Sequence, residues 1–153
     1  MEIVKDIPRL PPRPTEGHKG TFGRVLVIAG SMGMTGAAAL AGRSSLRAGS
    51  GLVRVATSRS ALPIVAAIEP CYTTIPLAED GEGRISLEAL NTILDAVQDN
   101  DVVAIGPGLG QSDGLRSIVE TLVQQEGLQL LIDGDGLNNL SRLRDWPKKC
   151  RAQ

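Results

Sequence analysis

Two glycine-rich segments each follow an apolar run of strand length, a placement that suits the binding of an anionic small molecule. The segments are GSMGMTG at 30–36, after VLVIA at 25–29, and GPGLG at 106–110, after VVAI at 102–105. Glycine lets backbone N–H groups approach a phosphate closely, and ligands of open parallel sheets bind beyond the carboxyl ends of the strands. The two segments therefore predict one shared small-molecule site.

The second segment is the more specific indication of a ligand site. Pro107 stiffens its turn, and Gly106, Gly108 and Gly110 expose N–H groups that have no competing side chains. Such amides suit a diphosphate or a sugar hydroxyl. The alternative is that each segment is an ordinary strand-to-helix turn without a ligand, and the residues alone leave both interpretations open.

A third polar element, Asp133-Gly134-Asp135, follows another apolar run at 130–132. Because the carboxyl ends of parallel strands meet at one edge of a sheet, we expect it at the same edge as the two glycine segments. Asp133 and Asp135 are candidate ligand contacts, and Asp135 is equally a candidate cap for a helix predicted over 136–143.

His18 is the sole histidine of the chain and lies in a loop before the first long strand, where a hydrogen-bonding role is the safer interpretation than catalysis. Its neighbour Lys19 is a candidate phosphate contact. Arg43 and Arg47, four residues apart on a helix that is rich in small side chains, are interpreted as solvated or sheet-edge residues.

A reductase is the main alternative, because a GxxGxxG segment also opens the dinucleotide-binding fold. That fold places an acidic residue after its second strand, where this chain has Thr57-Ser58-Arg59, although Arg59 would suit a 2′-phosphate. A reductase of this type also needs a Tyr-xxx-Lys pair, and the sole tyrosine, Tyr72, has Pro76 four residues on. Hydride transfer is therefore not predicted. No Ser-His-Asp set, metal cluster or carboxylate pair can be assembled either.

The elements that must position these loops are apolar strands alternating with amphipathic helices. Strands are expected at 25–29, 52–56, 102–105 and 128–132, with a weaker one at 72–76. Helices are expected over 35–48, ending at Gly49, and behind Ser86 and Ser112 as N-caps. Runs that are apolar throughout are typical of parallel strands covered on both faces. The sequence therefore predicts an α/β fold with three layers and a mostly parallel sheet.

The amino-acid composition limits the kinds of molecule that the protein is expected to bind. The 153 residues carry a formal net charge of −1 and only three aromatic side chains, so neither nucleic acid nor a membrane surface is an expected partner. Cys71 and Cys150 lack metal-ligand spacing, and reduced cysteines in the cytoplasm are expected. Residues 1–14 form neither a signal peptide nor a membrane span, and 1–17 is interpreted as an extended N-terminal arm.

Four motifs taken together resemble one family closely. They are HKGTFGRVLVIAGS at 18–31, TGAAALAG with LRAGSGLVRVAT within 35–57, AIGPGLG at 104–110 and LIDGDGLNNL at 131–140. The family is that of the ADP- or ATP-dependent NAD(P)H-hydrate dehydratases, which have a ribokinase-like fold. The resemblance runs from about His18 to Trp146 in family order, and the combination is more specific than any single motif.

The resemblance implies a lyase of metabolite repair, which uses ADP or ATP with Mg2+ to remove water from NADHX or NADPHX. In that family the Gly-Ala step matching Gly36-Ala37 and the glycine loop matching Gly108 line the site of the hydrated nicotinamide nucleotide. Asp133 and Asp135 match an Asp-containing strand end, with glycines in place of the more usual alanines.

The family pattern also continues further than this chain does. Its later Thr-Pro-His-Pro-Gly-Glu, Lys-Gly and Gly-x-Gly-Asp segments have no counterpart here, and the expected catalytic aspartate of the last would lie beyond Gln153. We therefore expect 18–153 to be the N-terminal half of a truncated dehydratase domain, inactive alone. It would hold a dinucleotide and associate with the missing C-terminal half or with further copies of itself. The alternative is a catalytically dead dinucleotide-binding or subunit-interaction module.

Overall fold

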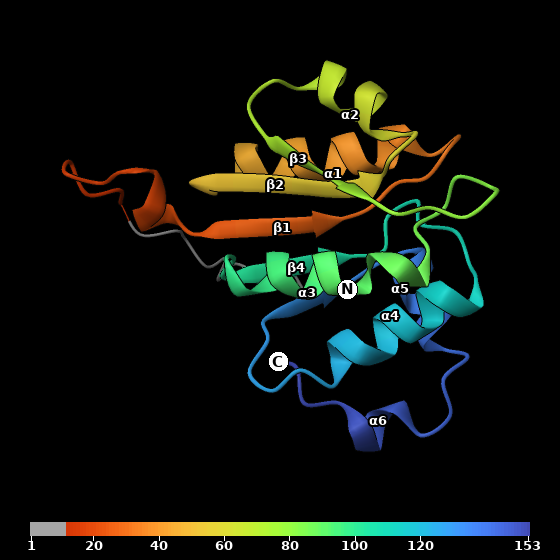
Figure 1. Cartoon of the computed structure of the whole chain (residues 1–153). Coiled ribbons are helices and arrows are strands. Elements are labelled where there is room, and N and C mark those ends of the chain that lie inside the picture. Colours follow the sequence, from red (N-terminus) through yellow and green to blue (C-terminus); the bar gives the residue numbers. More distant parts are fainter. Residues whose placement is uncertain (1–11) are drawn as a thin grey trace, which may run out of the picture.

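The computed structural model describes residues 12–153 (Figure 1). Of the predicted arm over 1–17, residues 1–11 therefore lie outside the described part. Residues 12–14 form no regular element, and a turn follows in which the N–H of Gly17 donates to the carbonyl of Pro14 at 3.1 Å.

A five-stranded sheet with the order β3-β2-β1-β4-β5 forms the centre of the molecule, and each of its pairings is parallel. The strands are β1 Arg24–Ile28, β2 Leu52–Ser58, β3 Thr73–Leu77, β4 Val102–Ile105 and β5 Leu130–Ile132. Parallel strands are joined by helical crossovers that cover the sheet, which explains why the central strands β1 and β4 are largely apolar. The predicted α/β class is confirmed.

Helices cover both faces of this sheet (Figure 1). They are α1 Thr35–Ala48, α2 Leu62–Ile68, α3 Leu90–Gln98, α4 Asp113–Val123, α5 Asp135–Leu140 and α6 Trp146–Lys149, with short 3-10 helices η1 Lys19–Phe22 and η2 Leu87–Ala89. None of the helices in 12–153 is long and apolar enough to cross a membrane.

Successive side chains of β1 point to opposite faces of the sheet and so belong to two separate hydrophobic clusters. Leu26 and Ile28 face α3 and α4, where they join the larger cluster that includes Ile93 and Ile118. Val27 belongs to the second cluster, with residues of α1, β2 and α2. These two apolar layers, one on each side of the sheet, give the predicted three-layer arrangement.

Local signals explain most of the element boundaries. The hydroxyl of Ser112 accepts from the N–H of Leu115 at 3.1 Å, and Gly49 ends α1 in the left-handed conformation with φ 113°, as the sequence predicts. Ser86, in contrast, makes no capping bond, because the chain enters the 3-10 helix η2 before α3 begins.

The last predicted elements differ in extent from the observed ones. β5 begins at Leu130 rather than at residue 128, because the carbonyl of Leu128 accepts from the N–H of Gln153 at 2.8 Å instead of joining the ladder with β4. The helix expected over 136–143 is α5, which ends three residues earlier, at Leu140.

Candidate functional site

The strand order reverses beside β1, and both glycine segments lie at that reversal. The chain proceeds from β1 to β2 and β3 on one side and then crosses to β4 and β5 on the other. The N–H of Gly30 donates to the carbonyl of Pro107 at 2.9 Å, and the N–H of Gly106 donates to that of Ile28 at 3.1 Å. A crevice at such a reversal is the usual ligand site of an open α/β sheet.

Gly108 brings the second loop against the first turn of α1. A Cβ built on Gly108 would lie 2.8 Å from the Cβ of Ala37 and 2.9 Å from that of Met34, and its φ is +68°. The buried hydroxyl of Ser31 donates to the carbonyl of Gly108 at 2.8 Å. The structure thus brings together Gly36, Ala37 and Gly108, which the sequence analysis proposed as one site.

Unbonded backbone amides gather at this contact. Within 12–153, the N–H groups of Thr35 and Gly36 at the start of α1 and of Gly108 in the second loop donate to no other group. A Cβ built on Gly36 would meet no atom within 4 Å, so the space beside this residue is open. Free amides at the N-terminus of a long helix attract anions through their N–H groups and the helix dipole.

Gly106 is required by packing. A Cβ at this residue would overlap the carbonyl oxygen of Asp133 and lie 2.9 Å from the amide nitrogen of Gly136, and its φ is +136°. The glycine therefore lets β4 and β5 approach each other where both strands end. The side chain of Asp133 is exposed at this edge and forms no hydrogen bond or ion pair with the described residues.

Asp135 holds the second loop. Its carboxylate accepts from the N–H of Gly110 at 2.9 Å and from Nδ2 of Asn138 at 3.0 Å. The suggested role as helix cap is wrong, because Gly134 is the N-cap of α5 and Asp135 belongs to the first turn. The N–H of Gly110, a candidate ligand donor in the sequence, is therefore satisfied by this carboxylate.

Two residues absent from the sequence-based site also contact this loop. Asn139 is fully buried and donates from Nδ2 to the carbonyl of Gly110 at 2.9 Å. Arg84 donates from Nη1 to the carbonyl of Gln111 at 3.2 Å. Neither Asn139 nor Arg84 has a role in the site predicted from the sequence, because neither lies in a glycine segment or directly after a strand.

The turn at 79–85 contacts both glycine segments. Its Gly83 carbonyl accepts from the N–H of Met32 at 3.1 Å, while the aliphatic part of Arg84 packs against Gly110 of the second segment. Within the turn, Asp80 accepts from the Arg84 guanidinium at 2.9 Å. Burial raises the pKa of Asp80, but the hydrogen bonds from Arg84 and from the Glu82 backbone, together with the Arg84 charge, leave that pKa below its ordinary value.

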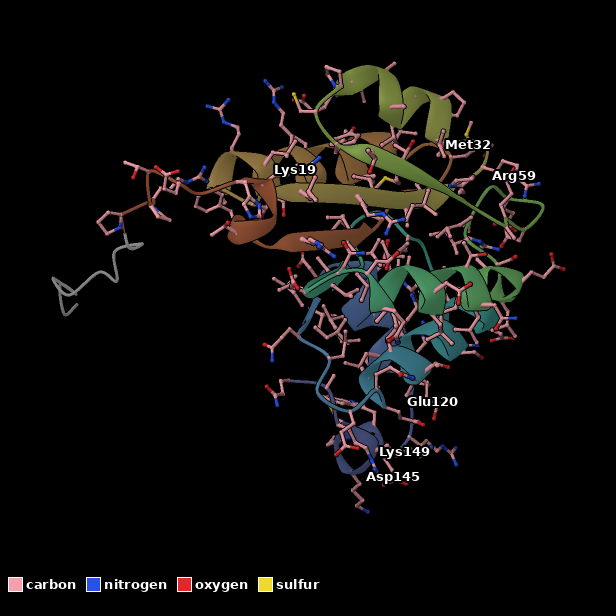
Figure 2. All side chains as sticks on the ribbon, turned by 60° about the vertical axis from the view of Figure 1, so that its left-hand side comes forward. Lys19, Met32, Arg59, Glu120, Asp145 and Lys149 are labelled. Carbon is pink, nitrogen blue, oxygen red and sulfur yellow. The ribbon has the colours of Figure 1, made fainter. Side chains whose placement is uncertain are left out.

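His18 and Lys19 lie away from this site. Both precede β1, so they lie at the amino end of the sheet, whereas the glycine segments lie at the carboxyl end. Figure 2 shows Lys19 at the opposite end of the sheet from Met32 and Arg59. The ring of His18 accepts from the N–H of Gly20 at 3.2 Å as the cap of η1. The suggestion that Lys19 contacts the phosphate is therefore wrong for this site.

No group of three or more His, Cys, Asp or Glu side chains that could hold a metal ion occurs in the described range. Cys71 and Cys150 are free and exposed.

The fold and the loop arrangement define a class of α/β proteins with a ligand crevice at the strand reversal, and solved ribokinase-like structures share it. A structure described as an ADP/ATP-dependent NAD(P)H-hydrate dehydratase from Bacillus subtilis, co-crystallised with ATP and Mg2+, is 31% identical with a TM-score of 0.67, over 84% of this chain and 43% of that one. An uncharacterised Streptococcus mutans protein superposes with a TM-score of 0.75 at 29% identity, over 92% and 47% of the two chains.

Sequence comparison identifies the family. The sequence profile of the NAD(P)H-hydrate dehydratases matches residues 25–152, and the chain belongs to this family. A bifunctional NAD(P)H-hydrate repair enzyme of Moorella thermoacetica is 39% identical over 133 residues, which are 87% of this chain and 25% of that protein. An ADP-dependent (S)-NAD(P)H-hydrate dehydratase of Xanthomonas campestris is 34% identical over 85% of this chain and 45% of the relative. The chain thus spans less than half the length of these relatives.

Proposed function

We propose that this chain supplies the part of a dehydratase site that binds the hydrated dinucleotide, in a reaction that uses ADP or ATP to remove water from NADHX or NADPHX. The observation that carries the proposal is the set of unbonded amides of Thr35, Gly36 and Gly108 beside open space. Backbone donors at a helix N-terminus suit the diphosphate that every nicotinamide dinucleotide carries.

The residues of the chain bind and orient the substrate in this proposal. The amides of the first turn of α1 hold the diphosphate, and the exposed carboxylate of Asp133 is available to a ribose hydroxyl at the end of β5. The substrate-site residues proposed are Gly36, Ala37, Gly106, Gly108, Gly110, Asp133 and Asp135, with Gly106, Gly110 and Asp135 shaping the loop.

The described residues support the binding of a nucleotide better than the binding of Mg2+. A nucleoside phosphate would find the same kind of donor in the free amides, and it would supply the energy that drives loss of water. For Mg2+ the described residues offer no cluster of ligands, so we derive no step through the metal. Removal of the hydroxyl group as water is assigned to residues that this chain does not contain.

The remaining length of the relatives' domain, or another subunit, would complete the site under this proposal. We further infer a cytoplasmic location, because the two cysteines are free and exposed and nicotinamide cofactors are used there.

Calorimetric titration of the purified chain with NADPH, followed by an assay of NADPHX dehydration at 340 nm with ADP or ATP, tests the proposal. We expect saturable heat and no turnover. Absence of saturable heat would overturn the binding role. Turnover at the rate of a complete family member would overturn the assignment of water removal to residues outside the chain.

A further inference from the structure

We propose that Arg84, Asp135 and Asn139 form a loop clamp that presets the backbone of 106–110 for the ligand, so that all three are positioning residues. The inference deepens the proposed function and rests on it for the identity of the ligand. The clamp takes its members from two elements, the turn at 79–85 and α5, neither of which belongs to a glycine segment.

The three side chains bond to three backbone polar groups of Gly110 and Gln111, at the end of the loop. The carboxylate of Asp135 accepts from the N–H of Gly110 at 2.9 Å, and Asn139 donates to the carbonyl of the same residue at 2.9 Å. Arg84 donates to the carbonyl of Gln111 at 3.2 Å. Gly110 is thereby held on both sides of its Cα, which fixes the orientation of both adjoining peptide planes.

Asn139 is oriented by its own bonds. Its Nδ2 also donates to the carbonyl of Asp135 at 2.7 Å, so both hydrogens of the amide are used. Its Oδ1 is buried and has no partner among the described residues. An unsatisfied buried acceptor costs free energy, which an apolar side chain would avoid. The asparagine therefore stabilises the structure through its bonds to the carbonyls of Gly110 and Asp135.

Arg84 is held as a fixed donor. Its Nε bonds to Asp80 at 2.9 Å and its Nη1 pairs with Glu82 at 3.0 Å, so two carboxylates of the same turn hold the guanidinium in place. The aliphatic part packs on the loop, because a Cβ on Gly110 would lie 3.0 Å from the Cδ of Arg84. Gly110 also has φ +75°, so the clamp and the backbone conformation both require glycine there.

The clamp decides which amides face the ligand. With the N–H of Gly110 bonded to Asp135 and that of Leu109 bonded to the carbonyl of Gly106 at 3.2 Å, the free donor of this loop is Gly108. Gly108 lies against the start of α1, where the other free amides are, in a loop whose far end is fixed. Asp135 accordingly acts on the ligand through the loop and without touching it.

Amide hydrogen exchange of the whole chain, measured by NMR, tests the clamp without reference to any ligand. Asp135→Leu removes the acceptor, whereas Asp135→Asn retains a carbonyl oxygen at the same place. We expect exchange at Gly110 to accelerate at least about tenfold in Asp135→Leu, because its N–H is left without an acceptor, and to change much less in Asp135→Asn, which keeps an acceptor. Exchange at Val103 in β4 reports global stability, and Ser141→Ala at the exposed C-cap of α5 is the matched control.

Titration with NADPH provides the second readout. We expect the dissociation constant to rise about tenfold in Asp135→Leu and to change little in Asp135→Asn or Ser141→Ala. Unchanged exchange at Gly110 in Asp135→Leu would overturn the clamp. Preserved exchange with lost binding in Asp135→Asn would instead show that the Asp135 charge touches the ligand, which also overturns it.

If the wild-type chain binds no NADPH, the proposed function fails and the exchange data alone decide the clamp. If Asp135→Leu does not fold, Arg84→Met tests the same loop from the partly exposed turn. We then expect faster exchange at Gly110 in Arg84→Met, with wild-type exchange at Val103, and an unchanged Gly110 rate would overturn the clamp.

Discussion

Replacing Gly36 with alanine is expected to stabilise the free protein while removing its ability to bind an anionic ligand. Gly36 lies in the first turn of α1, has no atom within 4 Å of a Cβ built on it, and has no positive φ that would require glycine. The packing of the protein therefore gives no reason for glycine here. A ligand that approaches the backbone amide does give one.

The size of the effect follows from helix propensity. Glycine within a helix costs about 0.5–1 kcal/mol relative to alanine, and an alanine at Gly36 causes no clash to offset that gain. For a protein of this length, about 1 kcal/mol corresponds to a rise of about 2–4 °C in the melting temperature.

Gly42→Ala is the matched control on the same helix. A Cβ there would lie 2.7 Å from Cγ2 of Val55 and 3.0 Å from Cδ1 of Tyr72. Both neighbours are buried, so overpacking should destabilise the fold by about 1–3 kcal/mol.

Thermal denaturation followed by circular dichroism, with and without NADPH, measures both consequences. A ligand that binds only the native state raises the melting temperature of the wild type. Gly36→Ala should begin at a higher melting temperature and gain nothing from NADPH. A lower melting temperature without ligand would refute the claim that an alanine fits at Gly36. An undiminished rise in melting temperature with NADPH would refute the claim that Gly36 belongs to the ligand site.

Tyr72→Phe should cost about 1 kcal/mol in urea denaturation, because the buried hydroxyl donates to a carbonyl of α2 at 2.6 Å; an unchanged free energy of unfolding would contradict this bond. Gly106→Ala should destabilise by at least about 2 kcal/mol, since its Cβ would overlap the Asp133 carbonyl in a backbone with φ +136°, and a variant of wild-type stability would disprove that contact. The lowered pKa of Asp80 means that its bonds to Arg84 stabilise the protein fully above the ordinary aspartate pKa, and this contribution is lost as pH falls through the lowered folded value. Asp80→Asn should therefore reduce the loss of stability in acid, measured by urea denaturation across that range, and an identical pH profile would argue against the bond.

The sheet and the adjacency of the glycine segments could be predicted because they depend on local signals. Apolar runs identify buried parallel strands, and the rule that their carboxyl ends share one edge brings 30–36 and 106–110 together. Ser112 and Gly49 likewise mark helix ends through bonds within one turn.

The clamp could not be predicted, since its bonds join residues that are distant in sequence. Asn139 lies 29 positions from Gly110 and Arg84 lies 27 from Gln111. An asparagine or an arginine is compatible with many surface roles until the tertiary structure is known. The position of Lys19 could have been inferred, because a residue before β1 lies at the amino end of a parallel sheet.

The turn at 79–85 has a consequence for the entropy of binding. It bonds to Met32 of the first segment and, through Arg84, to Gln111 beside the second, while Gly30 joins the two segments directly. These contacts close a ring around the strand reversal, and a ring of bonds fluctuates less than two separate loops do. A ligand that enters has little backbone freedom left to remove, so more of its interaction energy appears as affinity.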